Sequence, residues 1–475
     1  MNTVDSPSTP LRLGDVLSRQ RAAFLRDGPP TLRQRKDDLL KLKAVMLANR
    51  DEIERALRED FGHRAPQETA IMEVMSVTLG INYQRKQLRR WMRPEKRHVP
   101  MTFQPGRAWV SYQPRGVIGI VSPWNYPLAL ALMPLATAIA AGNRAMIKPS
   151  EFTPASSELL AKMVSSTFAE DQVAVARGDG AVGQEFAALP FDHLVFTGST
   201  QVGRAVMKAA SENLVPVTLE LGGKSPAIVD RGHPMKHAAT GIAYGKLANS
   251  GQTCVAPDYV MVHEDSVEPF VTAYDQAVRA LYPDGPSGDS YTSIINERHY
   301  ERLQALLDDA RSQGAKVREV GANAGDARRR AHTLAPTVVI GSTARMRILR
   351  EEIFGPVLPV IAYREIDEAI AYVNAHPRPL ALYFFGNDGP NRRKVLALTT
   401  SGNVTINNTL MHYAQDDLPF GGVGPSGIGA YHGIEGFKSL SHAKGVFQQG
   451  TWNLSGLLRP PFGSLTNLIL KLMLR

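Results

Sequence analysis

Cysteine is almost absent from this sequence: Cys254 is the only one among 475 residues. A single cysteine cannot form an intrachain disulfide, so the disulfide-stapled secreted folds are excluded and a reducing compartment is favoured. Residues 1–10 hold no basic segment followed by an apolar run. This pattern predicts no export signal, and we expect a cytoplasmic protein.

The sequence also lacks a hydrophobic run long enough to span a membrane. The tail from Ser455 to Arg475 is apolar, but Arg459 and Lys471 interrupt it. Its uninterrupted part is far below the ~20 residues that a spanning helix needs. We expect residues 451–475 to form a C-terminal tail with a packed helix. Peripheral contact of this tail with a membrane or a partner is a less favoured alternative.

The charge is moderately basic, with 54 Lys plus Arg against 45 Asp plus Glu and a formal net charge of +9. Such a charge attracts anionic ligands without identifying one. The densest basic stretch runs from Arg85 to Arg97, and its spacing of three to four residues predicts a solvated helix face. Nucleic-acid binding would require a recognised fold or interleaved stacking aromatics, and neither is apparent. No metal site is predicted.

What the sequence does contain is a repeated alternation of short apolar strands and helices. The length predicts two or three folding units. Two strand–helix–strand units precede Gly222, and they predict a parallel sheet with crossover helices that binds a nucleotide at the carboxyl ends of its strands. Their predicted elements are 116–121, 128–141 and 144–148, then 193–196, 201–211 and 215–219.

A second alternating set follows Gly222, with a helix at 236–248, a strand at 259–263 and helices at 267–282 and 297–313. The predicted fold class is therefore α/β, with a Rossmann-like cofactor domain, a second α/β catalytic domain and a small bridging β element. We assign 1–98 and 114–220 to the cofactor-binding domain and 221–424 to the catalytic domain. Residues 99–113, including a strand predicted at 102–112, and residues 425–450 would form the bridging and oligomerisation segments.

One glycine pattern is a candidate phosphate site and another is misleading. Phe196–Ser199 follows an apolar strand and leads into a helix, and such a helix start favours an anion, although a simple tight turn fits as well. Gly422–Gly427 (GVGPSG) matches the dinucleotide fingerprint, but it follows no strand and contains Pro425 where a helix should begin. We interpret the second pattern as a structured loop.

Cys254 lies in Gly251–Cys254 (GQTC), after a predicted helix and beside a glycine. A lone cysteine is usually a small buried hydrophobe, but a thiolate also attacks aldehydes to give a thiohemiacetal, a good hydride donor. The thioester that follows needs a base for water. Glu220 ends a predicted strand before Gly222 and fits that role, or it caps a helix or forms an ion pair. Asn125 could donate a hydrogen bond to the oxyanion.

Seven motifs in order resemble the aldehyde dehydrogenase superfamily. They are PWNYP (123–127), KPSE (148–151), FTGS (196–199), LELGGKSP (219–226), GQTC (251–254), EEIFGPV (351–357) and PFGG (419–422). The stretch LPFGGVGPSGIGAYHG (418–433) is similar to the branch with fatty and aromatic aldehyde dehydrogenases, among them the bacterial coniferyl aldehyde dehydrogenases.

The resemblance implies a role for each matching residue. Cys254 would be the nucleophile, Glu220 the general base, and Asn125 the oxyanion donor together with the amide of Cys254. The implied cofactor residues are Lys148 and Glu151 at the adenosine ribose, Trp124 and Ser199 near the pyrophosphate, Glu352 and Phe354 at the nicotinamide ribose and ring, and Gly198 and Gly203 at the helix entry.

The implied reaction is oxidation of a hydrophobic, aromatic, coniferyl-type aldehyde to its acid, and the implied assembly is a homodimer. The implied cofactor is NAD, because the carboxylate of Glu151 would bond a free ribose hydroxyl and repel a 2′-phosphate. Nearby arginines leave NADP use open. Tyr126, His412 and Tyr413 are candidate walls of the substrate pocket. The alternatives are a CoA-acylating aldehyde dehydrogenase, which would not depend on Glu220, and a catalytically silent structural relative.

Overall fold

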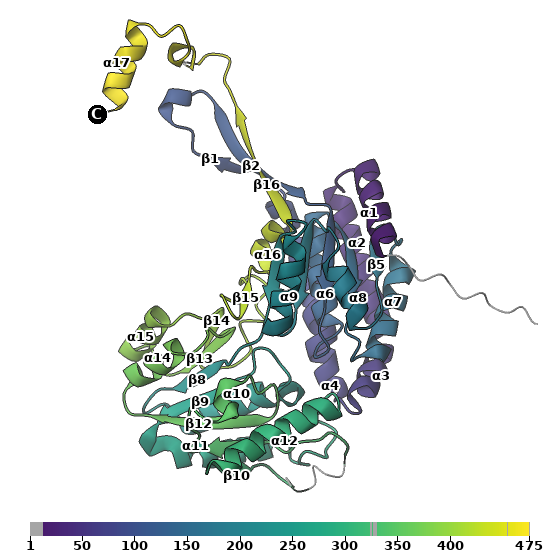
Figure 1. Cartoon of the computed structure of the whole chain (residues 1–475), viewed down its shortest axis with the longest axis vertical. Helices are drawn as coiled ribbons and strands as arrows, with labels where there is room; N and C mark the ends of the chain where they lie inside the picture. Colours follow the sequence, from purple (N-terminus) through teal and green to yellow (C-terminus); the bar gives the residue numbers. More distant parts are fainter. Residues whose placement is uncertain (1–12, 324, 326–329, 454, 475) are drawn as a thin grey trace, which may run out of the picture.

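The protein consists of two α/β lobes and an arm that extends away from them (Figure 1). The computed structural model describes residues 13–323, 325, 330–453 and 455–474. The segment in which the sequence predicts no export signal lies outside the described residues.

The first lobe is built on a six-stranded sheet in the order β15-β7-β6-β3-β4-β5, parallel except for β15. The apolar runs predicted as strands form its fully or largely buried centre, which confirms the predicted parallel sheet. Its strands are β3 (Val117–Val121), β4 (Arg144–Lys148), β5 (Val173–Val175), β6 (His193–Thr197), β7 (Val217–Glu220) and β15 (Gly427–Ile428).

Helices cover both faces of this sheet (Figure 1). The central helix α6 (Ala129–Ala141) carries no charged residue and is buried at every position, as expected of a helix that is apolar all round. The other helices are α1 (Leu13–Asp27), α2 (Leu32–Ala48), α3 (Arg50–Phe61), α4 (Pro66–Thr69), the π-helix η1 (Ala70–Met75), α5 (Ser76–Trp91), α7 (Pro154–Thr167), α8 (Gly180–Ala187), α9 (Thr200–Ser211) and α16 (Gly433–Ser439).

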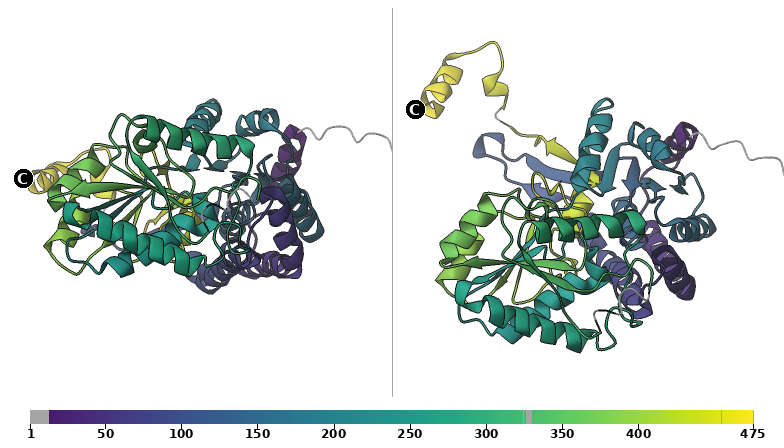
Figure 2. Two further views of the ribbon diagram at one scale, coloured as in Figure 1. Left: turned by 90° about the horizontal axis from the view of Figure 1, so that it is seen from below. Right: turned by 60° about the horizontal axis from the view of Figure 1, so that its bottom comes forward.

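The second lobe holds a seven-stranded sheet in the order β10-β11-β12-β9-β8-β13-β14, with only β10 antiparallel. Helices lie on both sides of it (Figure 2). The strands are β8 (Pro226–Val229), β9 (Tyr259–His263), β10 (Lys316–Glu319), β11 (Thr337–Ile340), β12 (Val357–Tyr363), β13 (Ala381–Phe385) and β14 (Asn403–Ile406). The helices are α10 (Met235–Leu247), α11 (Val267–Leu281), α12 (Glu297–Ser312), α13 (Arg347–Arg350), α14 (Ile366–Asn374) and α15 (Pro390–Leu398), with short 3-10 turns η3 (Ala248–Gly251) and η4 (Glu264–Ser266).

The arm is an antiparallel sheet in the order β1-β2-β16, made of β1 (Glu95–Arg97), β2 (Arg107–Pro114) and β16 (Ser441–Gln448). The strand expected at 102–112 begins later, because a 3-10 turn, η2 (Met101–Phe103), and the following turn precede it. Two strands also lie outside the segments expected from sequence. β1 joins the arm and not the cofactor lobe, and β15 pairs with β7 in the cofactor lobe and not with the arm.

The basic stretch from Arg85 to Arg97 is helical only as far as Trp91. The prediction of a solvated helix face is confirmed for Lys86, Arg89 and Arg90, which are exposed on α5. Arg93 is exposed after the helix, and Lys96 and Arg97 belong to β1.

A helix, α17 (Ser464–Met473), forms in the tail after the 3-10 turn η6 (Ser455–Leu458), but it does not pack on either lobe. Thr466 is its only buried residue, while Leu472 and Met473 are 67% and 57% exposed. The expectation of a packed terminal helix is thus wrong for the single chain. Across the described ranges, no helix has the length and apolarity to cross a membrane.

Candidate active site

The carboxyl ends of β3, β4, β6 and β7 meet along one edge of the six-stranded sheet, because these strands are parallel. Glu220 is the last residue of β7 and pairs with Thr197, the last residue of β6. Gly198 and Ser199 follow at once, and the hydroxyl of Ser199 accepts a hydrogen bond from the amide of Val202 to cap α9. The predicted strand-to-helix turn is therefore present.

Cys254 is held by a turn with unusual backbone geometry at the end of α10. Asn249, Ser250 and Gly251 have φ values of 51°, 50° and 75°, a left-handed conformation that costs non-glycine residues on the order of 1–3 kcal/mol each. A Cβ on Gly251 would lie 2.3 Å from the carbonyl oxygen of Gly355, so only glycine allows this close packing. This tightly packed turn leads directly into the segment that carries Cys254.

Glu68 anchors this turn from the first lobe. Its carboxylate accepts one hydrogen bond of 2.5 Å from the amide of Asn249 and another of 2.5 Å from the hydroxyl of Thr292. Since Asn249 begins the left-handed turn, this contact ties the position of Cys254 to helix α4.

A cavity of about 230 Å³ lies where the sheet edge faces the second lobe. Cys254 and Glu220 both line it. The full lining is Pro123, Trp124, Asn125, Leu130, Thr197, Gly198, Ser199, Glu220, Leu221, Gly222, Cys254, His299, Arg302, Glu352 and Phe354. Residues from both lobes therefore converge on one cleft.

The acid and the thiol in this cleft are strongly affected by burial. Burial raises the pKa of Glu220 well above its ordinary value, and neither carboxyl oxygen has a hydrogen-bond partner among the described residues. Burial, together with the Glu352 and Glu220 carboxyls, raises the pKa of the Cys254 thiol to about 12, while the amides of Cys254 and Val255 oppose the rise. Perturbed groups that share a cleft are typical of a catalytic site.

Glu352 enters the cleft from the second lobe against the backbone of Gly222. A Cβ on Gly222 would lie 2.1 Å from Oε2 of Glu352, so the glycine makes room for the carboxyl. Burial and the nearby Asp258 raise the pKa of Glu352 to about 7, and the amide of Gly223 donates a hydrogen bond to it.

Aromatic rings form the opposite wall. Trp124 contacts Phe354 at a ring-centroid distance of 5.4 Å and His299 at 4.9 Å. Phe354 itself has a φ of 50°, a second strained position in this cleft.

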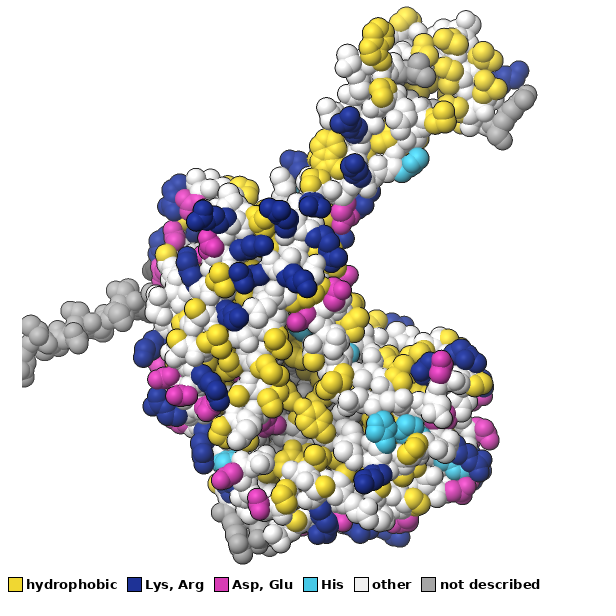
Figure 3. Space-filling view, turned by 180° about the vertical axis from the view of Figure 1, so that it is seen from behind, with side chains coloured by type: hydrophobic (Ala, Val, Ile, Leu, Met, Phe, Trp, Pro, Cys, Tyr) yellow, Lys and Arg dark blue, Asp and Glu magenta, His cyan; other side chains and the backbone are white. Residues whose placement is uncertain are grey.

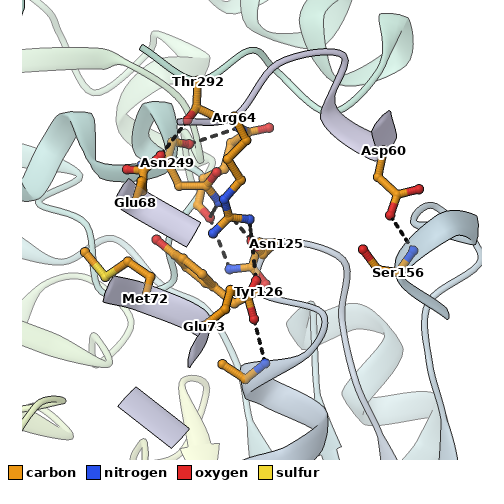
Figure 4. A network of polar contacts seen from close by, with 12 residues as sticks. Asp60, Arg64, Glu68, Met72, Glu73, Asn125, Tyr126, Ser156, Asn249 and Thr292 are labelled. Carbon is orange, nitrogen blue, oxygen red and sulfur yellow. Dashed lines mark hydrogen bonds and ion pairs between the residues drawn. The ribbon is translucent and has the colours of Figure 1, made fainter. Parts of the chain in front are cut away.

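Asn125 is fixed by a buried polar network that links the two lobes (Figure 4). Its backbone oxygen accepts hydrogen bonds of 3.0 Å from Arg64 and from Asn249, and its side-chain amide donates to the Gln252 carbonyl at 3.1 Å. The amide that the resemblance assigns to the oxyanion thus sits beside the turn that carries Cys254.

Arg64 is itself held by a fully buried ion pair with Glu73, at 3.5 Å between Nη1 and Oε1 (Figure 4). The other oxygen of Glu73 accepts a 2.6 Å hydrogen bond from the amide of Ala129, at the start of α6. The guanidinium also lies 4.9 Å from the ring centroid of Tyr126. The pair therefore holds the whole segment from Asn125 to Ala129 in place.

We expect Arg64→Leu to destabilise the protein by about 3 kcal/mol, because it leaves the Glu73 carboxylate buried without its cation. Thermal unfolding would show the loss as a lower midpoint. The double variant Arg64→Leu/Glu73→Leu should recover part of it, since both charges are then gone. A double variant less stable than Arg64→Leu would contradict this account of the pair.

A second cavity of about 230 Å³ lies next to the carboxyl end of β4, lined by Pro149, Ser150, Glu151, Pro154, Ser157, Arg177 and Gly178. Nζ of the buried Lys148 lies 3.4 Å from Oε2 of the partly exposed Glu151. Asp60 accepts hydrogen bonds from the amides of Ala155 and Ser156 and so fixes the start of α7, just after this site (Figure 4).

On its other side, Cys254 opens onto a third, mostly apolar cavity of about 280 Å³, which we call the tunnel. It is lined by Ile71, Met72, Met75, Ser76, Leu79, Tyr126, Leu130, Met133, Tyr244, Thr253, Cys254, Val255, Leu410, Met411, Tyr413, Ala414, Asp416 and His432. Hydrophobic side chains gather around the hollow between the two lobes (Figure 3). The thiol therefore stands between the cleft and an apolar tunnel.

The structure brings most of the predicted site residues into one cleft: Asn125, Trp124, Gly198, Ser199, Glu220, Cys254, Glu352 and Phe354 all line it. Lys148 and Glu151 lie at the neighbouring cavity, and Gly203 is buried in α9 against Leu221. Tyr126 and Tyr413 line the tunnel as expected. His412 does not line it and instead forms a hydrogen bond with Thr405, whereas His432 does line the tunnel.

Sequence reasoning missed the polar network of Arg64, Glu68 and Glu73, and it missed Asp416 in the tunnel. Two acids at helical spacing, Glu68 in α4 and Glu73 in η1, were the available signal for the network. Their partners lie far away in the sequence, so no local pattern identified them.

Sequence comparison now adds to this geometry. The profile of the aldehyde dehydrogenase family matches residues 18–446. The chain belongs to the aldehyde dehydrogenase family. It is an NAD(P)-dependent enzyme that oxidises an aldehyde, and the predicted α/β class and family are confirmed.

Two curated relatives bear the name probable coniferyl aldehyde dehydrogenase. The protein of Pseudomonas aeruginosa is 50% identical over 465 residues, which are 98% of this aldehyde dehydrogenase and 97% of the relative. The protein of Caulobacter vibrioides is 48% identical over 457 residues, which are 95% of this aldehyde dehydrogenase and 94% of the relative. Among solved structures, Staphylococcus aureus AldH in a substrate-bound state matches with a TM-score of 0.92 and 37% identity, over 98% of this chain and all of that one.

Proposed function

We propose that this aldehyde dehydrogenase oxidises a hydrophobic, aromatic aldehyde of the coniferyl type, with Cys254 as nucleophile, Glu220 as general base and Asn125 as oxyanion donor. The single observation that carries the proposal is the position of Cys254, which lines both the cleft and the apolar tunnel. An aldehyde in the tunnel reaches the sulfur from one side, and a cofactor in the cleft reaches the same carbon from the other.

In the first step Cys254 loses its thiol proton to water in the cleft, and its sulfur attacks the aldehyde carbon and forms a C–S bond. The oxygen becomes an oxyanion, and preorganised amide donors stabilise such charge strongly. The side chain of Asn125 and the amide of Cys254 are the donors on this side of the cleft. To act as a donor in this step, the Asn125 amide exchanges its hydrogen bond to the Gln252 carbonyl for one to the oxyanion.

The bound nicotinamide cofactor supplies the hydride acceptor. The cleft fits its reactive end: Glu352, Phe354 and Trp124 line a cavity of about 230 Å³ that reaches Cys254. After oxidation, Cys254 carries the acyl group as a thioester. Glu220 then takes a proton from water, the hydroxide attacks the acyl carbon, and the acid leaves as the C–S bond breaks.

For the cofactor we propose NAD in preference to NADP. Glu151 lines the cavity that would take the adenosine ribose, with Nζ of Lys148 3.4 Å from its carboxylate. That carboxylate would bond a free 2′-hydroxyl and repel a 2′-phosphate. Arg177 lines the same cavity and favours a 2′-phosphate, so we expect the enzyme to use NADP less well than NAD but still to use it.

We expect Glu151→Gln to shift the ratio of the kcat/KM values for NADP and NAD towards NADP by about 10-fold. Glu170→Gln, remote from this cavity, should leave the ratio unchanged. An unchanged ratio in both variants would refute the assignment.

The substrate class rests on the tunnel and on the relatives. The tunnel walls are aliphatic and aromatic, with Met72, Met133 and Tyr413 among them, and such walls suit an aryl ring. Relatives at 45–50% identity bear the name coniferyl aldehyde dehydrogenase.

Product analysis tests the proposed reaction against its two alternatives. The enzyme, an aryl aldehyde and NAD should give NADH and the free acid in equal amounts without CoA. Acyl-CoA as the only product, formed when CoA is added, would favour a CoA-acylating enzyme. No turnover on a broad panel of aldehydes with either cofactor would favour a catalytically silent relative.

We also propose a homodimer formed through the arm. In the described single chain, Phe447, Trp452 and Phe462 on or after β16 are 50%, 86% and 64% exposed, and β16 is an edge strand. An exposed edge next to apolar side chains is a ready surface for a second copy. The molar mass measured by light scattering should be twice the 51.9 kDa chain mass. A monomer at micromolar concentration would refute the proposed dimer. Membrane contact by α17 is the less favoured use of this surface.

A further inference from the structure

The tunnel contains one charged side chain in an otherwise apolar wall. Of the described residues that line it, Asp416 is the only carboxylate. Several of the other polar groups have partners: the hydroxyl of Tyr126 lies 2.7 Å from that of Thr253, and Ser76 donates to the Met72 carbonyl at 2.6 Å. His432 also lines the tunnel, and neither of its ring nitrogens has a hydrogen-bond partner among the described residues. A lone carboxylate in such a wall needs an explanation.

Asp416 belongs to the outer part of the tunnel, away from the thiol. Its chain neighbours Gln415 and Asp417 are exposed, and so is Leu79, which lines the tunnel mouth. A Cβ on Gly80 would lie 3.3 Å from Oδ1 of Asp416 and 2.6 Å from Cε of Met133, so the carboxylate lies against α5 beside a residue of the tunnel wall. Cys254 marks the other end, where the tunnel meets the cleft.

The carboxylate of Asp416 has no hydrogen-bond donor or cation within the part of the chain that the structure describes. Burial alone raises its pKa to about 6, with no compensating contact. Its neighbour Asp417 differs: it is exposed and accepts a hydrogen bond from the hydroxyl of Tyr83. A half-buried acceptor that faces a cavity and lacks a donor is suited to take one from a ligand.

We propose that Asp416 determines specificity by accepting a hydrogen bond from a hydroxyl group at the end of the aldehyde remote from the carbonyl. The substrate class is therefore an aryl aldehyde with a ring hydroxyl, held with its aldehyde at Cys254 and its phenol at Asp416. This inference rests on the proposed function and assigns to Asp416 the recognition of the substrate's remote end. A ring that lacks the hydroxyl leaves the carboxylate desolvated and unpaired, and sites of this kind reject such analogues.

The test compares two substrates that differ at one ring position, 4-hydroxy-3-methoxycinnamaldehyde and 3,4-dimethoxycinnamaldehyde, the second of which has a methoxy group in place of the hydroxyl donor. For the wild type, kcat/KM should be about 10- to 100-fold higher for the hydroxylated aldehyde, as expected of a hydrogen bond to a charged group. Asp416→Asn keeps the shape and should lower this preference at least several-fold. Asp416→Ala removes the acceptor and should bring the preference close to unity.

The matched control is Asp417→Asn, which removes the same charge one residue away and should keep the wild-type preference. Turnover of unsubstituted cinnamaldehyde reports whether each variant is folded, since that substrate makes no use of Asp416. A preference that survives in both Asp416 variants, or is absent from an active wild type, would overturn the inference and leave the proposed function intact. A wild type inactive on all three aldehydes would instead defeat the proposed function.

Discussion

Cys254→Ala is expected to lower aldehyde oxidation by at least about 10⁴-fold, because the variant has no atom that can form the thiohemiacetal. The oxyanion donors and the cofactor cleft remain in place but have no covalent intermediate to act on. Steady-state NADH formation with an aryl aldehyde measures the loss.

The single cysteine makes the control simple. One equivalent of a thiol reagent per chain should react with the wild type and none with Cys254→Ala, since the sequence has no other cysteine. Both proteins should bind NAD with similar affinity, which shows that the cleft is intact. Activity within about 10-fold of the wild type would mean that another group attacks the aldehyde.

Glu220→Gln is expected to slow steady turnover by roughly 10²- to 10⁴-fold, the usual contribution of a positioned base. Acylation does not need this carboxylate, so a rapid burst of NADH should precede the slow phase. The amide keeps the shape of the side chain, and because Glu220 has no hydrogen-bond partner among the described residues, little stability should be lost.

The pH profile tests the same residue. Burial raises the pKa of Glu220, and only the deprotonated carboxylate can accept a proton from water. The wild-type kcat should therefore rise with pH through a group that titrates well above an ordinary glutamate, and Glu220→Gln should lose this rise. Equal profiles in the two proteins would assign the titration to another residue.

Much of the fold was predictable because the informative segments are local. The buried strands β3, β4, β6 and β9 each consist of five mostly apolar residues next to a helix with its own period. The motifs around Cys254, Glu220 and Ser199 were predictable for the same reason, since each lies at the end of such an element.

What the sequence did not reveal depends on distant partners. The ion pair of Arg64 and Glu73 joins helix α6 through Ala129, and Glu68 joins Asn249 across 181 positions. Asp416 reaches the tunnel only through the fold, because the helix against which it lies, α5, is distant in the sequence. The prediction for the tail was wrong for another reason. An apolar helix predicts burial, but no other part of the described chain covers α17.

The most direct measurement of the central claim is the mass of Glu220→Gln, both intact and after digestion to peptides, once the variant has been mixed with an aryl aldehyde and NAD. Cys254 and Glu220 share the cleft, and if they act in sequence the acyl group must accumulate on the sulfur. We predict one acyl group per chain on the peptide that contains Cys254, with one NADH released. Free acid formed at the wild-type rate, with no adduct on that peptide, would contradict the account.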